Sequence, residues 1–277
     1  MSENLKKQFE EIKQLKGDKR EEALLTFAGK YNYPQAYNEL GVFYKDKKSD
    51  YVKAVEMFQK ALEIKKDATV YTNLATCYYM LSCPDTPERE AYMKKTVEAF
   101  EASARMNSAS YFFLGNLYMP GSNAPFPDDQ ELANSYFMKI EKDKKYFFAN
   151  GMKAIGTYYY KDKKDFPMAS AYLYLAKNAD PKDKKMANYY ELVFGKVTKR
   201  KFWEEQFQRL ISQNDVERVV REAREKLTIR CPRCGSMECQ KISVMTNVRK
   251  MLEVSFGIKR LEKYAKTYEC RSCKYEW

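Results

Sequence analysis

Apolar, small and aromatic residues recur at helical spacing along the first two-thirds of the chain. Offsets of three, four and seven residues place each set on one face of a helix. Four sets share this spacing: Tyr37/Leu40/Gly41/Tyr44, Tyr71/Leu74/Ala75/Tyr78, Tyr111/Leu114/Gly115/Tyr118 and Met152/Ile155/Gly156/Tyr159. The pattern predicts four helices in which a glycine or alanine lets a neighbouring helix approach closely, while tyrosine fills the space one turn further on.

Each of these segments is followed by a second stretch with helical spacing of its own. The matching sets are Ala54/Phe58/Ala61, Ala133/Phe137/Ile140, Ala169/Leu173/Ala176 and the weaker Thr96/Phe100/Ser103. The chain is therefore predicted to form successive helix pairs. Residues 5–16 and 18–30 are expected to form a degenerate first pair, and residues 187–192 to begin a fifth repeat.

The leucine or isoleucine of each set lies 34, 40 and 41 residues from the previous one, with insertions at 83–87 and 120–129 explaining the longer spacings. Over residues 1–198 this pattern resembles the tetratricopeptide and Sel1-like families of helical-repeat proteins. The resemblance implies a mainly α fold, an α-solenoid of stacked helix pairs with a continuous core and an extended concave surface. The proline usual after the second helix is mostly missing, although Pro181 follows the fourth pair.

In such an array the first helix of each pair lines the concave side, so polar residues one turn from the packing positions are candidate binding residues. The candidates are Asn38, Asn73, Thr76, Asn116, Lys153 and Thr157. For each of them the alternative is a solvated polar side chain without a ligand. Tyr160 and Tyr190 fall outside the packing pattern and are further candidates for an interface.

Peptide-binding members of this family often hold a terminal carboxylate in a basic clamp. Asn73 stands where such a clamp places an asparagine. The positions for its lysine and arginine in the following repeat are occupied by Ala109 and Phe113. We therefore do not expect this clamp in the present chain.

Four cysteines near the C-terminus form a CxxC…CxxC motif with 35 residues between the pairs: Cys231, Cys234, Cys270 and Cys273. Tetrahedral zinc is bound by four such thiolates, and a CxxC turn supplies two of them. The segment 229–277 resembles a zinc ribbon, a small β-type fold, which implies one structural Zn²⁺. Redox-active dithiols or unmetallated cysteines are the alternatives, and Cys239 is not needed as a ligand.

This segment departs from a plain ribbon in two respects. Residues 249–266 are longer than a β-turn and have helical apolar spacing, and the acidic pair at the hairpin tip of elongation-factor ribbons is missing. A role in stimulating RNA cleavage is therefore not supported. Residues 199–228 form a third region, predicted to be capping or linker helices; a basic arm that contacts nucleic acid is the alternative.

Charge and composition narrow the possible functions. The chain carries 50 Lys+Arg against 38 Asp+Glu, a net charge of +12. Residues 229–277 alone have eleven basic and five acidic side chains. Histidine is absent, which excludes every mechanism with a histidine base or ligand. Phosphate-binding loops, dinucleotide fingerprints and nucleophile elbows are also missing.

We therefore predict a non-enzymatic adaptor: the repeat array binds a protein or peptide, and the zinc ribbon makes a second contact. The alternative is a nucleic-acid-binding regulator that acts on DNA or RNA through the basic ribbon. Its candidate residues are Arg233, Lys241, Arg249, Lys250, Lys259, Arg260 and Arg271. No signal peptide or membrane-spanning run is recognisable, and the paired cysteines are typical of a reducing compartment. We expect a cytoplasmic protein without membrane contact; the sequence does not define its oligomeric state.

Overall fold

The computed structural model of the chain describes residues 3–213, 215–228, 233, 239–241 and 268–274. The chain divides into two compact units, Met1–Arg200 and Lys201–Trp277. The first unit ends two residues beyond the predicted end of the repeat array.

Unit 1 consists of successive helices, with one π-helical and one 3₁₀ turn at helix ends. They are α1 (Glu3–Lys13), α2 (Gly17–Tyr31), α3 (Pro34–Phe43), η1 (Tyr44–Lys48), α4 (Tyr51–Ile64), α5 (Ala68–Ser82), α6 (Arg89–Ala104), η2 (Ser108–Ser110), α7 (Tyr111–Tyr118), α8 (Gln130–Phe137), α9 (Lys145–Lys161), α10 (Phe166–Ala179) and α11 (Lys184–Phe194). The predicted succession of helix pairs is confirmed.

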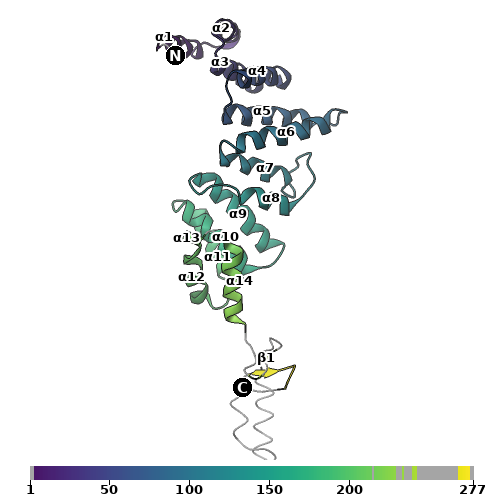
Figure 1. Cartoon of the computed structure of the whole chain (residues 1–277), viewed down its shortest axis with the longest axis vertical. Coiled ribbons are helices and arrows are strands. Elements are labelled where there is room, and N and C mark those ends of the chain that lie inside the picture. Colours follow the sequence, from purple (N-terminus) through teal and green to yellow (C-terminus); the bar gives the residue numbers. More distant parts are fainter. Residues whose placement is uncertain (1–2, 214, 229–232, 234–238, 242–267, 275–277) are drawn as a thin grey trace, which may run out of the picture. The chain divides into compact units, whose positions relative to one another are not determined.

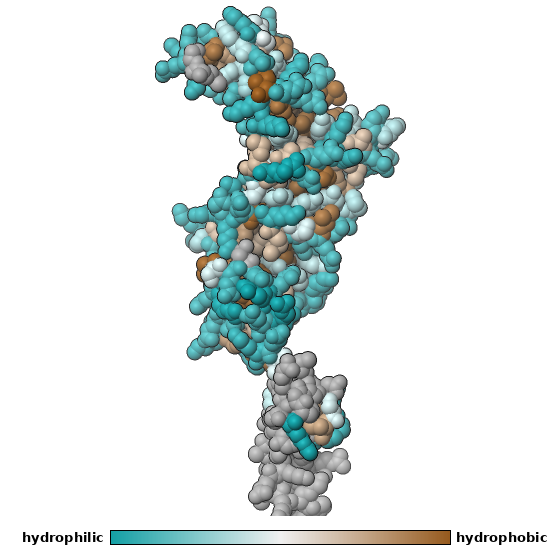
Figure 2. All heavy atoms as spheres, in the orientation of Figure 1, coloured by the Kyte–Doolittle hydropathy of each residue, from teal (hydrophilic) through white to brown (hydrophobic). Residues whose placement is uncertain are grey.

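Each helix of unit 1 packs against its neighbours in the chain, from α1 on α2 to α10 on α11. Figure 1 shows α3 to α10 following one another in chain order. The surface visible in Figure 2 is largely hydrophilic, with apolar side chains confined to patches. This is the arrangement of a repeat array, in which each pair buries its apolar face on the next pair.

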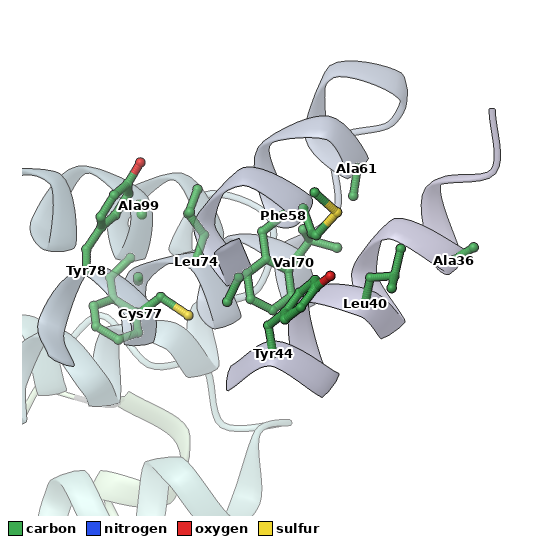
Figure 3. Packing of buried hydrophobic residues seen from close by; sticks show 14 of the residues in the cluster. Ala36, Leu40, Tyr44, Phe58, Ala61, Val70, Leu74, Cys77, Tyr78 and Ala99 are labelled. Carbon is green, nitrogen blue, oxygen red and sulfur yellow. The ribbon is translucent and has the colours of Figure 1, made fainter. Parts of the chain in front are cut away.

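The small residues of the first helices allow the close approach that the sequence predicts. A Cβ placed on Gly41 of α3 would lie 2.5 Å from Cε1 of Phe58 on α4, and Gly115 on α7 has the same relation to Phe137 on α8. Phe58 and Phe137 are fully buried. Figure 3 shows Phe58 among Leu40, Tyr44 and Val70. Glycine is required because these rings occupy the space of a side chain.

Aspartates begin many of the helices. The Oδ1 of Asp50 accepts a hydrogen bond from the backbone N–H of Lys53 at 3.0 Å, and Asp129 accepts one from Leu132 at 2.9 Å. Such N-caps satisfy backbone donors that have no partner inside the helix. Asp129 is therefore the N-cap of α8.

A charged network connects the first pair to the second. Glu21 on α2 accepts hydrogen bonds from Lys48 Nζ at 2.5 Å and from the Tyr44 hydroxyl at 2.6 Å. The bond from Lys48 is the main cause that lowers the pKa of Glu21 below its ordinary value. Burial, followed by the bond to Glu21, raises the pKa of Tyr44 to about 12. Arg20 and Glu39 add an ion pair of 2.7 Å between α2 and α3.

This network predicts a pH-dependent contribution to stability. Because the folded-state pKa of Glu21 is lowered, its contribution is present above the unfolded pKa of about 4.3 and is lost as the pH falls through the folded value. We expect Glu21→Gln to lower the free energy of unfolding by less than about 1 kcal/mol at pH 7 and by less in acid. Urea unfolding at the two pH values tests this. The exposed neighbour Glu22 is the control; an equal, pH-independent loss in Glu21→Gln and Glu22→Gln would contradict the network.

Helix α12 (Arg200–Gln208) begins at the last residue of unit 1 and otherwise belongs to unit 2. The unit also contains α13 (Leu210–Gln213) and α14 (Val216–Leu227), then β1 (Cys239–Lys241) and β2 (Tyr268–Cys270). Trp203, Phe207 and Leu210 are buried, as are Val216 and Val219. An ion pair of 2.7 Å joins Arg209 to Glu222 on α14. The two strands pair antiparallel. The predicted helical stretch of residues 199–228 is thus present; its capping role stays a prediction.

Candidate functional site

The six predicted binding residues all lie on first helices of unit 1. Asn38 is on α3, Asn73 and Thr76 are on α5, Asn116 is on α7, and Lys153 and Thr157 are on α9. Lys153 is exposed and the other five are half-buried. The structure brings four of these residues into two neighbouring pockets, and places Asn38 and Asn73 elsewhere.

The first pocket, here called the apolar pocket, has a volume of about 530 Å³. Its lining is Thr76, Tyr79, Phe100, Phe113, Asn116, Leu117, Met119, Ser122 and Ala124. Phe113 is held by stacking on Phe100, with ring centroids 5.5 Å apart, and by an edge contact with Phe147 at 5.9 Å. The apolar wall is therefore built from three consecutive helices of the array, α5, α6 and α7, together with the connection that follows α7.

The second pocket, here called the basic pocket, has a volume of about 600 Å³. Its lining is Phe112, Asn116, Met119, Pro120, Gln130, Asn150, Lys153, Ala154, Thr157, Tyr158, Lys161 and Asp162. Lys153 and Lys161 are exposed, and neither forms an ion pair with any residue that the structure describes. With Asp162 as its single carboxylate, this pocket has a net positive charge.

Several polar groups of the basic pocket are already hydrogen-bonded. Asn150 Nδ2 donates to the carbonyl of Tyr146 at 2.8 Å, and Thr157 Oγ1 donates to the carbonyl of Lys153 at 2.8 Å. Thr157 also accepts from the Tyr189 hydroxyl at 3.3 Å. By contrast, the amide of Asn116 makes no hydrogen bond within the described part of the chain. Asn116 and the two lysines are thus the groups ready to bind a ligand.

Asn116 and Met119 line both pockets, so the two form one continuous groove across α5, α7 and α9. The 119–129 connection supplies part of both walls. Sequence reasoning identified this segment as an inserted loop but not as part of a site. It also missed Lys161, Asn150 and Tyr79, which lie on the predicted helices without any distinguishing periodic pattern.

Asn38 and Asn73 bond to each other instead of lining this groove. Asn73 Nδ2 donates to Asn38 Oδ1 at 3.4 Å, and Lys45 Nζ donates to Asn73 Oδ1 at 3.4 Å. Asn38 borders a separate cavity of about 250 Å³. Ala109 is buried and Phe113 is stacked on Phe100, so no cation occupies the clamp positions, as the sequence indicates.

Of the two tyrosines proposed for an interface, one belongs to the core. Tyr190 is 4% exposed and stacks on Phe194 with ring centroids 5.2 Å apart. Its prediction as an interface residue is wrong, because α11 packs on α10 and buries it. Tyr160 is half-buried and has an edge contact with Tyr189 at 6.3 Å.

One half of the predicted zinc site is described. Cys270 ends β2 and is buried, residues 271–273 form a turn, and Cys273 is half-buried. The N–H of Lys274 donates to the carbonyl of Cys270 at 2.8 Å, and Lys274 has a left-handed φ of 58°. In the sequence, Gly235 follows Cys234 at the same offset, and glycine is the residue that adopts a left-handed φ most readily. A tight turn with a buried cysteine fits a thiolate pair for zinc.

The other pair, Cys231 and Cys234, lies outside the described residues. Among the residues that the structure does describe, no cluster of three or more potential metal ligands occurs. In the sheet, Cys239 is the register partner of Cys270. Cys239, which is not one of the four predicted zinc ligands, therefore lies opposite one of them. In the repeats, burial raises the pKa of Cys77 to about 12, which keeps it a neutral thiol.

The candidate nucleic-acid contacts of the ribbon are only partly visible. Arg233 and Arg271 are exposed, and Lys241 ends β1 opposite Tyr268. The remaining four, Arg249, Lys250, Lys259 and Arg260, lie outside the described residues.

Comparisons with known proteins show similarity to solved structures. The crystal structure of c5321, a protective antigen of uropathogenic Escherichia coli strains that displays an SLR fold, is 23% identical and covers 77% of this chain, with a TM-score of 0.49. The match spans 44% of that structure, less than half of its length. No family model and no curated protein matches the chain. Across the described residues, no helix combines the length and the apolar character needed to cross a membrane.

Proposed function

We propose that this chain is a non-enzymatic adaptor whose helical repeats bind an extended segment of a partner protein. The observation that carries the proposal is the continuous groove of the apolar and basic pockets, which runs over three successive first helices. Repeat arrays use such elongated surfaces for binding. The groove contains the amide of Asn116 and two lysine ammonium groups, none of which is paired with a residue that the structure describes.

The two halves of the groove suit different parts of a ligand. Tyr79, Phe113 and Leu117 line the apolar pocket, so a large apolar side chain gains by leaving water there. Lys153 and Lys161 flank the basic pocket and attract a carboxylate. Between them, Asn116 can donate to and accept from a peptide backbone. The partner segment is therefore one in which an apolar residue is followed or preceded by acidic residues.

A peptide-display selection on the full chain tests this assignment. We expect enrichment of segments that combine an apolar anchor with Asp or Glu. The double variant Lys153→Glu, Lys161→Glu should weaken such peptides about tenfold, since each exposed charge pair contributes up to about 1 kcal/mol. Peptides with lysine in place of the acids should regain affinity for the variant. The control is Lys60→Glu, an exposed lysine of α4 outside both pockets.

Selected peptides without acidic residues, or with equal affinity for the double variant, would contradict the proposed ligand chemistry. Two peptides determine the direction of the bound segment, one with the acidic residue before the apolar anchor and one with it after the anchor. The order that binds more tightly gives the direction in which the peptide lies in the groove.

The second contact of the adaptor is proposed for the zinc ribbon of residues 229–277. Cys231, Cys234, Cys270 and Cys273 would hold one Zn²⁺. A site closed by four cysteines has no open position for a substrate, so the metal would serve structure. The turn at Cys270–Lys274 supports this proposal, because it has the tight backbone that a two-thiolate turn needs.

The alternative, a nucleic-acid regulator that acts through this ribbon, is supported by the exposure of Arg233 and Arg271. The two proposals differ in their dependence on the C-terminal segment. Peptide binding by the groove should survive changes at Arg249, Lys250, Lys259 and Arg260, whereas nucleic-acid binding by the ribbon should not.

A further inference from the structure

The turns of the repeat array fall into two classes that carry opposite net charge. Turns within a helix pair, each with the first two residues of the next helix, are 14–18, 44–52, 83–90, 119–131 and 162–167. Turns between pairs are 32–35, 65–69, 105–109, 138–146 and 180–185. The first class has seven basic and eleven acidic residues, and the second has ten basic and five acidic residues.

These two classes lie on different edges of the array. Helices joined by short turns run antiparallel, so the chain reverses at one edge within a pair and at the other edge between pairs. Figure 1 shows the α5–α6 turn and the long α7–α8 connection on the right of the stack, and the α6–α7 and α8–α9 turns on the left. We call the edge formed by the turns between pairs the inter-pair edge.

Carboxylates of the inter-pair edge are engaged by the protein itself. Asp67 accepts hydrogen bonds from the N–H groups of Thr69 and Val70, at 2.8 and 3.2 Å. Asp183 accepts from Lys185 and Met186, at 2.9 and 3.0 Å. These aspartates are helix caps, so their charge is directed at backbone donors while the neighbouring lysines extend into solvent.

The positive charge is concentrated at the α8–α9 and α10–α11 turns. Lys145, Lys182, Lys184 and Lys185 are exposed, and none of them is in an ion pair within the part of the chain that the structure describes. Helices α9 and α11 both pack on α10. Since packed helices lie about 8–10 Å apart, the starts of α9 and α11 are separated by at most about two such spacings, so the two turns follow one another along the edge.

An exposed aromatic ring lies in the same cluster. Tyr146, next to Lys145, is 67% exposed. Its ring is supported by an edge contact with Phe147, with centroids 5.3 Å apart. Exposed aromatic rings beside lysines are the two elements by which proteins bind single-stranded nucleic acids: bases stack on the rings and phosphates pair with the cations.

We propose that the inter-pair edge around Tyr146, Lys145, Lys182, Lys184 and Lys185 is a binding surface for single-stranded nucleic acid. The α8–α9 and α10–α11 turns place several lysines along one edge, which suits a polymer whose anions repeat along its length. An acidic protein would satisfy the lysines but gives no role to the exposed ring. This surface is distinct from the peptide groove, and from the ribbon residues considered above.

Fluorescence anisotropy with a labelled oligonucleotide of about 16 nucleotides, as RNA and as DNA, tests the proposal on the full chain at about 50 and about 200 mM salt. The edge variant Lys145→Gln, Lys182→Gln, Lys184→Gln, Lys185→Gln should bind at least about tenfold more weakly. Affinity falls as salt rises, and each phosphate contact to a single strand adds about 0.7 to the steepness of log affinity against log salt. Loss of the four lysines should therefore make this dependence shallower by about 3. Tyr146→Ala should weaken binding about tenfold through lost stacking.

Two matched variants distinguish this edge from a general charge effect and from the ribbon. Lys16→Gln, Lys47→Gln, Lys163→Gln, Lys164→Gln removes the same charge from the opposite edge and should change affinity less than twofold. The variant Arg249→Gln, Lys250→Gln, Lys259→Gln, Arg260→Gln should retain the edge-dependent binding.

The proposal is overturned if the oligonucleotide does not bind at the lower salt concentration, if the edge and opposite-edge variants lose equal affinity, or if the ribbon variant alone abolishes binding. Equal affinity for poly-glutamate would assign the edge to an acidic protein instead. Circular dichroism of each variant, expected to match the parent chain, shows that losses are not due to unfolding.

Discussion

Removal of zinc is expected to unfold residues 229–277 while the helical repeats remain folded. The segment is too short to bury a large apolar core, and structural zinc contributes about 10–16 kcal/mol of apparent folding free energy to domains of this type. Residues 229–277 belong, together with most of α12 and with α13 and α14, to the unit Lys201–Trp277, which is separate from the repeat unit Met1–Arg200, so their unfolding need not affect the repeats. Metal analysis should return one zinc per chain, and chelation should change hydrogen exchange only in the C-terminal segment.

Cys231→Ser and Cys270→Ser should each release the metal and reproduce the effect of chelation. Two other cysteines serve as controls. Cys83→Ser changes an exposed thiol of the repeats, and Cys239→Ser changes the register partner of Cys270. Both should retain zinc. Full zinc retention in Cys231→Ser and Cys270→Ser would refute the four-cysteine site, and loss of zinc in Cys239→Ser would make Cys239 a ligand.

Substitution of Gly115 is expected to disrupt the helical array locally. The Cβ of an alanine there would overlap the ring of Phe137, which is fully buried and cannot move away freely. Overpacking of this kind costs about 1–3 kcal/mol and exceeds the gain of up to about 1 kcal/mol in helix propensity from glycine to alanine. Gly115→Val should cost more, because its branched side chain adds further atoms to the overlap.

Gly29→Ala is the matched control, because a Cβ at Gly29 of α2 meets nothing within 4 Å. That substitution should leave stability unchanged or raise it slightly. Denaturant unfolding followed by far-UV circular dichroism measures both. Equal stability of the Gly115→Ala and Gly29→Ala chains would show that α7 and α8 are not packed as closely as the structure indicates.

The repeat pattern was sufficient to predict the helix pairs because packing alone sets it. Gly41 packs against Phe58, and this contact requires a small residue on one helix and a large one on the next. Small and large residues therefore recur at helical spacing in the sequence. Helix ends were less predictable. In the weak first pair, the ends of α1 and α2 differ from the expected limits by up to three residues. Few packing residues define these ends.

The candidate site was predictable only in part. Asn116, Lys153 and Thr157 do converge, because their position relative to the packing residues puts them on one face. Asn38 and Asn73 have the same position relative to the core but form a hydrogen bond with each other. This contact depends on how α3 and α5 pack in three dimensions, which the periodic pattern of the sequence does not reveal. Lys161 and the 119–129 connection join the site through the relative placement of α7 and α9. Tyr190 was misassigned because residues 187–192 were expected to begin a repeat, but the packing positions within that repeat were not assigned.

The groove proposed to bind a peptide crosses α5, α7 and α9, which belong to three different helix pairs. In the free protein each pair is stabilised chiefly by the pairs on either side, so the array can lose structure one pair at a time. A bound segment that spans all three pairs would couple their unfolding, because local unfolding of any one pair would also require release of the ligand. Binding of the segment should therefore change the thermal unfolding of these three helix pairs from a gradual to a single sharp transition. This holds even if the contacts with each pair are individually weak.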